Sequence, residues 1–114
     1  MIKLPLSLQA WGTKDFNRVL KQEIQNLDPG LLPLQQGLSL SSYVGSSPIS
    51  AIILNSRQET DSIIIKAGIF YTGIIAGCSC SDDPSPVDEQ NEYCEIMIHI
   101  HPTSADTRIF LNQA

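Results

Sequence analysis

The chain has 114 residues, of which 42% are hydrophobic and 17% charged, and its formal net charge is −5. This length suits one domain that buries about two thirds of its unfolded surface, and the composition excludes a wholly disordered chain. The 7 Lys and Arg residues are scattered among 12 Asp and Glu residues, which argues against a nucleic-acid partner, because phosphate binding needs clustered cations.

Two apolar stretches, residues 1–10 and 63–77, resemble targeting or membrane segments only superficially. In the first, Pro5 interrupts a short alternation of leucines with polar residues, so a cleaved signal is not favoured. The second contains Lys66 and three glycines, and a bilayer helix needs about 20 apolar residues. We therefore expect no membrane partner.

Residues 13–27 are predicted to form an amphipathic helix. Its apolar residues recur at spacings of four, four and three, which places them on one helical face. They are Phe16, Leu20, Ile24 and Leu27. Thr13 is the expected N-cap, residues 28–30 supply a stop, and Trp11 is placed to pack on the same face.

Residues 31–48 are predicted to be an irregular connector, because prolines and glycines punctuate them and five serines crowd residues 39–47. Apolar residues interspersed with these serines leave open a short strand at residues 38–44. Beyond this connector the pattern changes to that of a sheet, with segments rich in β-branched and aromatic residues. The predicted strands are residues 49–54, 63–75, 93–101 and 107–112.

These segments predict the α+β class: an antiparallel β-sheet of about four strands in two hairpins, with one N-terminal amphipathic helix packed on one face. Residues 55–61 and 102–106 are the expected turns. The second strand is too long to stay flat, so Gly68 or Gly73 is expected to mark a bulge or a bend where the strand curls around the core. The chain shows no repeat and no internal boundary, so residues 1–114 are expected to form a single domain.

An acidic, cysteine-bearing segment, residues 77–95, joins the two predicted hairpins. It holds all 3 cysteines and six of the 12 carboxylates, with no Lys or Arg. Its acids do not follow the spacing of a calcium loop, and Cys78-x-Cys80 is not the C-x-x-C spacing of structural zinc. We expect a solvated loop outside the packed interior, and its candidate partner-binding residues are Asp82, Asp83, Asp88, Glu89, Glu92 and Tyr93.

The odd number of cysteines does not suit a secreted scaffold of paired disulfides and favours a reducing cytoplasm. Counting alone leaves open one disulfide with a free thiol. Zinc or iron held by Cys78, Cys80 and Cys94, completed by a carboxylate, is the alternative to a plain solvated loop. Redox chemistry is disfavoured, because a reactive thiolate needs neighbouring positive charge and this segment is negative.

A histidine pair, His99 and His101, lies on one face of the predicted strand 93–101, in an H-x-H spacing that catalytic zinc sites use. The opposite face carries Cys94 and three isoleucines and is the better core face, so the favoured interpretation is two surface imidazoles. One metal could reach Cys94 and both histidines only through a bulge. No nucleophile, phosphate-loop or dinucleotide motif is present, so we assign no catalytic or cofactor-binding residue.

Three segments carry a resemblance to known sequences: residues 66–71 (KAGIFY), 77–84 (GCSCSDDP) and 89–95 (EQNEYCE). They resemble a family of small uncharacterised bacterial proteins, over roughly the last two thirds of the chain. The family has no assigned activity, so the resemblance implies a bacterial cytosolic protein and carries over no functional residue.

The sequence therefore favours a small non-catalytic module that binds a protein or small molecule through residues 78–95 and the sheet surface beside them. The alternative is a zinc- or iron-binding protein that uses the three cysteines or the histidine pair. A thiol redox enzyme is the least favoured class. An unpaired edge strand could also be covered by a second copy, which would give a homodimer.

Overall fold

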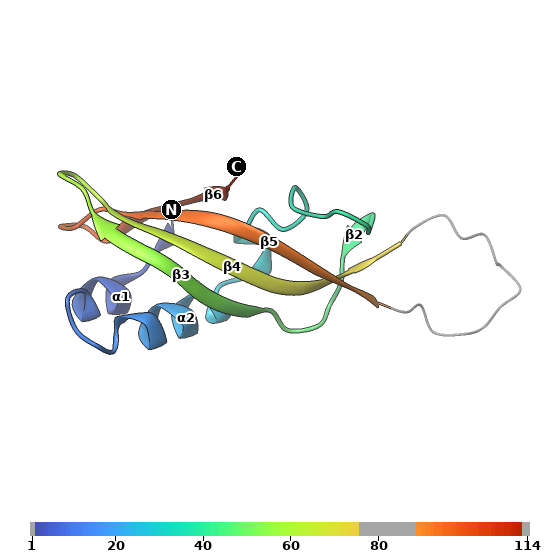
Figure 1. Cartoon of the computed structure of the whole chain (residues 1–114), viewed down its shortest axis with the longest axis horizontal. Coiled ribbons are helices and arrows are strands. Elements are labelled where there is room, and N and C mark those ends of the chain that lie inside the picture. The colour runs from blue at the N-terminus through green and yellow to red at the C-terminus, as the bar shows by residue number, and fades with distance from the viewer. Residues whose placement is uncertain (1, 76–88, 113–114) are drawn as a thin grey trace, which may run out of the picture.

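The structure is a computed structural model that describes residues 2–75 and 89–112, and it shows one antiparallel sheet with helices on one face (Figure 1). The elements are, in chain order, β1 (Ile2–Lys3), α1 (Pro5–Ala10), α2 (Phe16–Asn26), the 3-10 turn η1 (Pro29–Leu31), β2 (Tyr43–Val44), β3 (Ser50–Gln58), β4 (Ile63–Ile74), β5 (Glu89–Ile100) and β6 (Asp106–Leu111). The strands of the described residues are arranged β1-β6-β5-β4-β2, and β3 also pairs with β4. β3 lies beside the first part of β4 and β2 beside its end.

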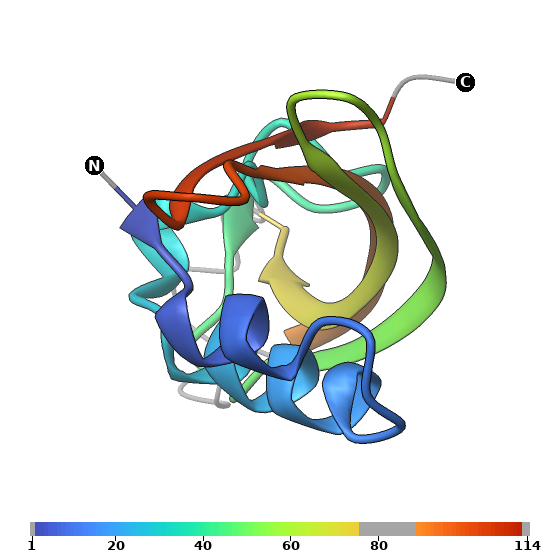
Figure 2. The ribbon, with the colours of Figure 1, turned by 90° about the vertical axis from the view of Figure 1, so that its left-hand side faces the viewer.

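The long hairpin of β4 and β5 is the frame of the sheet. The two strands pair without interruption from Ile63 opposite Ile100 to Ile74 opposite Glu89. Because side chains alternate along a strand, one face of this hairpin is almost entirely apolar. Figure 2 shows that the sheet curls, with the helices lying in its concave side.

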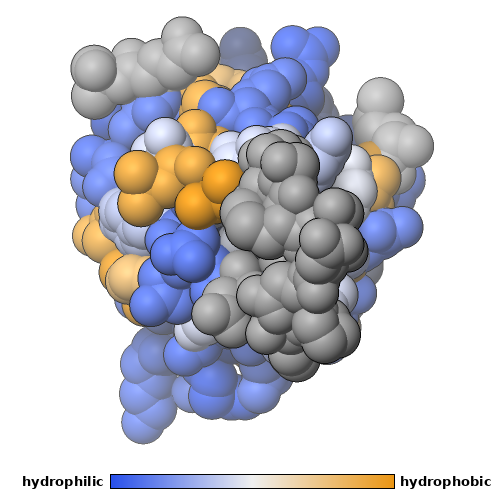
Figure 3. Space-filling model, turned by 90° about the vertical axis from the view of Figure 1, so that its right-hand side faces the viewer, coloured by the Kyte–Doolittle hydropathy of each residue, from blue (hydrophilic) through white to orange (hydrophobic). Residues whose placement is uncertain are grey.

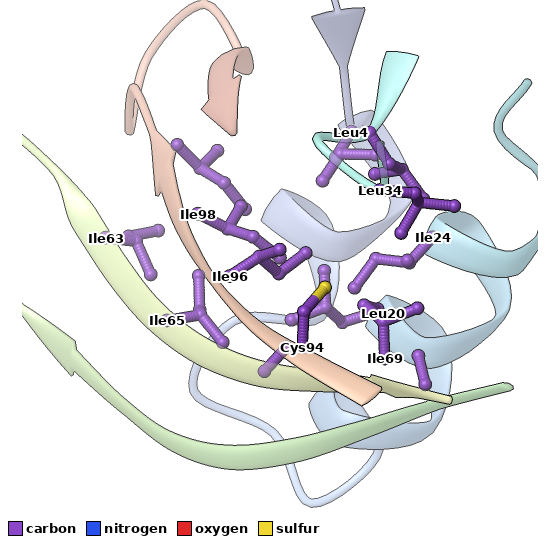
Figure 4. Packing of buried hydrophobic residues seen from close by; sticks show 14 of the residues in the cluster. Leu4, Leu20, Ile24, Leu34, Ile63, Ile65, Ile69, Cys94, Ile96 and Ile98 are labelled. Atoms are coloured by element: carbon purple, nitrogen blue, oxygen red, sulfur yellow. The ribbon is translucent and has the colours of Figure 1, made fainter. Parts of the chain in front are cut away.

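The core lies between the concave face of the sheet and α2 (Figure 4). The helix contributes its predicted apolar face, in which Phe16, Leu20 and Ile24 are all buried. The strands contribute mainly isoleucines, and the fully buried ones are Ile63, Ile65, Ile69, Ile96, Ile98 and Ile100. Because these branched side chains alternate regularly along the strands, they all lie on the face of the sheet that packs against α2.

The short helix α1 is held by α2. The backbone N–H and the hydroxyl of Ser7 both donate to Glu23 Oε1, at 2.5 and 2.6 Å. The Trp11 ring meets Phe16 edge-on, with ring centroids 4.8 Å apart. Since an isolated helix this short is unstable in water, these contacts explain why residues 5–10 become helical. No helix in the described part of the chain is long and apolar enough to cross a bilayer.

The predicted class, a mixed fold with an antiparallel sheet, is confirmed, but the number of elements is higher than predicted. The described residues form six strands instead of about four, and two α-helices instead of one. The direct pairing of β4 with β5 makes a further hairpin, so Glu89–Glu92 belong to a strand and not to a loop. Of the two alternatives predicted for β4, a bulge at Gly68 or Gly73 is wrong, because the register shift lies in β3, between Ile53 and Asn55. The sheet does curl around the core, as predicted (Figure 2).

Candidate functional site

The far end of the β4–β5 hairpin, beyond the reach of the helices, is covered by residues 34–47, which we call the serine strap (Figure 1, teal to green before β3). The strap is tied to β4 by hydrogen bonds along its length. The Tyr71 hydroxyl donates to the Leu34 carbonyl at 2.8 Å, and the Gly45 N–H donates to the Thr72 carbonyl at 2.7 Å. The strap therefore covers the end of the sheet that α1 and α2 do not reach.

Glu92 of β5 is the centre of this arrangement. Its Oε1 accepts hydrogen bonds from the N–H and hydroxyl of Ser39, at 2.9 and 3.0 Å. Its Oε2 accepts from the N–H of Leu40 at 3.1 Å and from the N–H and hydroxyl of Ser41 at 2.9 and 2.7 Å. The residue is 3% exposed. One buried carboxylate thus satisfies three consecutive backbone donors of the strap.

Two opposing effects set the pKa of Glu92. Burial raises it, because a carboxylate loses its hydration, but the hydrogen bonds from the Ser39 N–H and its neighbours on the strap stabilise the anion and lower the pKa to about 2. Glu92 is therefore ionised at neutral pH. A carboxylate with this pKa and with both oxygens occupied is a poor general base, so the geometry assigns it to holding the strap.

Glu89, three residues before Glu92 in β5, makes a second, more exposed attachment of the strap. Its Oε1 accepts from the Ser46 N–H at 2.8 Å, and its Oε2 accepts a short hydrogen bond from the Ser47 hydroxyl. The Ser47 hydroxyl and the Ser46 N–H lower the pKa of Glu89. The serine-rich composition of the strap is thus explained by two carboxylates on one strand.

Cys94 lies on the concave face beneath the strap and is 7% exposed. Gly37 passes so close that a Cβ there would lie 2.7 Å from Cys94 Cβ and 3.0 Å from its sulfur. Burial raises the pKa of the Cys94 thiol, and burial together with this thiol also raises the pKa of the Tyr71 hydroxyl. The thiol is therefore protonated and covered, the opposite of a reactive cysteine.

This burial predicts slow chemistry at Cys94. In a variant in which Cys78→Ser and Cys80→Ser leave one thiol, we expect a disulfide reagent to label Cys94 about 100-fold more slowly in the native chain than in denaturant. Adding Gly37→Ala should accelerate labelling, since the new methyl group forces the strap away from the sulfur. Gly30→Ala, whose new methyl group would meet only Asp28, should leave the rate unchanged, and equal rates in all three chains would contradict the packing.

On the convex face of the same hairpin lies an exposed aromatic pair, Phe70 and Tyr93. The two residues are opposite each other in the β4–β5 register, and their ring centroids are 4.8 Å apart. Gly68 makes room for the tyrosine, because a Cβ there would lie 2.5 Å from the Tyr93 hydroxyl oxygen. Phe70 is 47% exposed and Tyr93 40%.

A hollow of about 620 Å³ opens beside the aromatic pair and connects it to the strap. Its lining residues are Ser39, Phe70, Tyr71, Asn91, Glu92 and Tyr93. Lys66 and Glu95 form an ion pair at 3.3 Å next to it, and the Tyr93 hydroxyl donates to Glu95 Oε2 at 3.2 Å. The aromatic pair is therefore flanked by polar groups that already have partners.

The histidine pair lies at the other end of β5. His99 is on the convex face, where its ring meets Phe110 with centroids 4.9 Å apart. His101 follows the strand, and its Nδ1 accepts hydrogen bonds from the N–H groups of Thr103 and Ser104 at 3.2 and 3.3 Å. Both histidines line a hollow of about 350 Å³ with Asp61 and Asp106. Within residues 2–75 and 89–112, no three His, Cys, Asp or Glu side chains are grouped to hold a metal ion.

The predicted site residues are therefore distributed over several places. Cys94 and His99 lie on opposite faces of β5, and Tyr93 is part of the aromatic pair. The prediction of a solvated loop is wrong for Glu92, which is buried. The remaining predicted residues lie outside the described part of the chain: Cys78, Cys80, Asp82, Asp83 and Asp88.

Sequence reasoning missed Ser39, Ser41 and Phe70 as members of this site. The serine cluster was visible, but nothing local connects it to a carboxylate 53 residues later. Comparisons of the chain with protein-family models, with curated proteins and with solved structures gave no match.

Proposed function

We propose that the protein is a small non-catalytic binding module that receives its partner at the aromatic pair, Phe70 and Tyr93, and the hollow beside it. The observation that carries the proposal is the exposure of two large rings on the continuously paired strands β4 and β5. Aromatic side chains bury much apolar area at little entropic cost and are enriched where proteins bind partners. Phe70 and Tyr93 fit this description.

The support beneath the pair favours the same function. Both rings stand on β4 and β5, and the concave face beneath them is fixed by the strap through Glu92. A preorganised surface loses little conformational entropy on association. The pair is thus a better anchor than an aromatic residue on a free loop.

The expected partner has an apolar surface bordered by basic groups. In sequence, β5 follows directly on Asp82, Asp83 and Asp88, which give this part of the chain its negative charge. Figure 3 views this end of the molecule, where a hydrophobic area is bordered by hydrophilic side chains. Leu40 of the strap and Ile75 after β4 are large apolar residues exposed in this region. Such a combination suits a mixed interface with electrostatic steering.

Photo-crosslinking from the aromatic pair tests the proposal. With a benzophenone amino acid in place of Phe70, we expect a saturable crosslink to one protein of the bacterial host, and Tyr93→Ser should abolish it. The same amino acid in place of Leu31, which is 49% exposed after α2, is the matched control and should not give that product. Identical products from both positions would refute a specific site at the pair.

The pair should also be dispensable for folding. We expect Phe70→Ser with Tyr93→Ser to lower the free energy of unfolding by less than about 1 kcal/mol, because the rings are half exposed and the core lies on the other face. Urea denaturation followed by circular dichroism measures this. A loss of several kcal/mol would mean that the pair serves stability instead of recognition.

Elemental analysis separates this function from the zinc or iron alternative. Protein purified without chelator should carry no stoichiometric transition metal if the binding module is the correct function. One metal per chain that is lost in Cys78→Ser, or in His99→Ala with His101→Ala, would instead establish the alternative.

A further inference from the structure

We propose that the groove between α2 and the free edge of β3 binds an extended, acidic segment of a partner protein, which adds to the sheet as a further strand. The groove has a volume of about 400 Å³. It is lined on the helix side by Asn17, Arg18 and Lys21 and on the strand side by Ala51, Ile52 and Ile53. This surface is distinct from the aromatic pair and goes beyond the function proposed above.

The edge of β3 that faces α2 is open to a further strand. In the described residues β3 pairs with β4 alone, so its other side has no strand neighbour. The Ala51 N–H points to that side, because it donates to Gln25 Oε1 of α2 at 2.9 Å. By the alternation of antiparallel strands, the N–H and C=O of Ile53 point the same way. An added strand would pair with the Ile53 groups and, at Ala51, would take the place of Gln25 as acceptor.

The hydrogen bond from Ala51 to Gln25 shows which kind of group binds at this edge. A side-chain amide oxygen is chemically equivalent to a backbone carbonyl, so Gln25 supplies at Ala51 what a neighbouring strand would supply. Asn17, Lys21 and Gln25 follow one another at intervals of four along α2 and so share one side of the helix. Lys21 and Asn17, one and two helical turns before Gln25, therefore lie beside the part of β3 whose edge remains open.

The rest of β3 is protected against pairing. Natural edge strands are interrupted by bulges and polar residues, which prevent uncontrolled association. The register shift of β3 lies between Ile53 and Asn55, and residues 55–58 are all polar and exposed. Only residues 50–53 combine a regular register with a free edge. The free edge of β3 is therefore confined to residues 50–53, which face α2, and this indicates a local binding site.

The charge of the groove indicates the occupant. The chain as a whole has a net charge of −5, yet the helix side of the groove carries two cations, Arg18 and Lys21. Within the described residues Arg18 makes one ion pair, a distant one with Asp15 at 3.8 Å between well-exposed side chains. An extended segment with carboxylates on alternate residues would direct them toward the helix while its backbone pairs with β3.

Fluorescence anisotropy with synthetic peptides tests this inference on the full chain. The probe is a short fluorescein-labelled peptide of alternating valine and glutamate, compared with one of alternating valine and lysine. We expect the acidic peptide to bind at least about tenfold more tightly, with an affinity that falls as salt is added. Equal affinities, or no binding of the acidic peptide, would overturn the proposal.

Matched variants locate the binding. Lys21→Glu should weaken binding of the acidic peptide at least about tenfold. Lys14→Glu changes another exposed lysine, before α2, that does not line the groove, and should alter the affinity by less than about twofold. Similar losses in both variants would mean attraction to general positive charge and would refute the site.

Two further changes test strand addition itself, one in the protein and one in the peptide. Ile53→Pro removes a backbone N–H from the free edge without removing a bond to β4, so it should abolish binding while circular dichroism stays native. The acidic peptide with alternate backbone nitrogens methylated should not bind the unaltered chain, and this holds even if the proline variant fails to fold. Retained binding of the methylated peptide refutes strand addition. Sedimentation that shows a dimer dissociated by Ile53→Pro, but not by the acidic peptide, would show that a second copy occupies the edge.

Discussion

Replacing Leu20 with alanine is expected to lower the free energy of unfolding by about 3 kcal/mol, which is one of the two largest losses that we predict for a single substitution in this chain. Leu20 is fully buried in the middle of α2 and faces the isoleucines of β4 and β5 (Figure 4). Deleting its side chain removes apolar burial and leaves a cavity that branched strand residues cannot fill. Urea denaturation followed by the fluorescence of Trp11, the 1 tryptophan of the chain, measures the loss.

The matched control is Leu6→Ala. Leu6 is also a leucine in a helix, but it lies in α1 with 56% of its surface exposed. We expect this variant to change the free energy of unfolding by less than about 0.5 kcal/mol. Equal losses of stability in the two variants would contradict the burial of Leu20 against the sheet and the exposure of Leu6.

The contrast between these leucines also shows what the sequence could reveal. The period of Phe16, Leu20 and Ile24 predicted the buried face of α2 correctly, because that pattern is a local consequence of helix geometry. Residues 5–10 offer no such period. In the sequence Pro5 interrupts an apolar run, whereas in the structure it lies in the first turn of α1. Backbone N–H groups there have no partner within the helix, so proline, which lacks one, is tolerated.

The strands show the same division between local and distant causes. The β-branched parts of β4 and β5 were predicted within a few residues, since the alternation of isoleucines is sufficient. The start of β5 was not, because Glu89–Glu92 have poor intrinsic strand propensity. They are extended because they pair with β4 and because the strap supplies donors to Glu89 and Glu92. A carboxylate whose partners lie 53 residues away looks, in sequence, like any solvated acid.

The aromatic pair was missed for a different reason. Tyr93 is predicted as the first residue of the strand 93–101 and as a partner-binding residue of the acidic segment, and Phe70 as one more apolar strand residue, and no local pattern brings the two together. Only the register of β4 against β5, which brings Phe70 opposite Tyr93, makes them one feature. That register depends on the whole hairpin and not on either residue.

Replacing Glu92 with glutamine is expected to lower the free energy of unfolding by roughly 3 kcal/mol at neutral pH. Glutamine keeps the size of the side chain but has one acceptor oxygen, and in either orientation its NH₂ group would face at least one backbone N–H of the strap, that of Ser39 or those of Leu40 and Ser41. Buried backbone donors would lose an ionic partner, which is costly because no water replaces it. The matched control is Glu89→Gln, at the more exposed attachment of the same strap, for which we expect a loss below about 1 kcal/mol.

The pH dependence of stability gives an independent measure of the same contact. The pKa of Glu92 is about 2 in the folded chain against an ordinary value of 4.5, and each pKa unit corresponds to about 1.4 kcal/mol. The contribution is therefore complete above pH 4.5 and is lost as the pH falls toward 2, because the unfolded chain takes up a proton that the folded chain does not. The unaltered protein should lose stability across this interval more steeply than Glu92→Gln. Parallel pH profiles for the two chains, or equal losses in Glu92→Gln and Glu89→Gln, would show that Glu92 does not hold the strap.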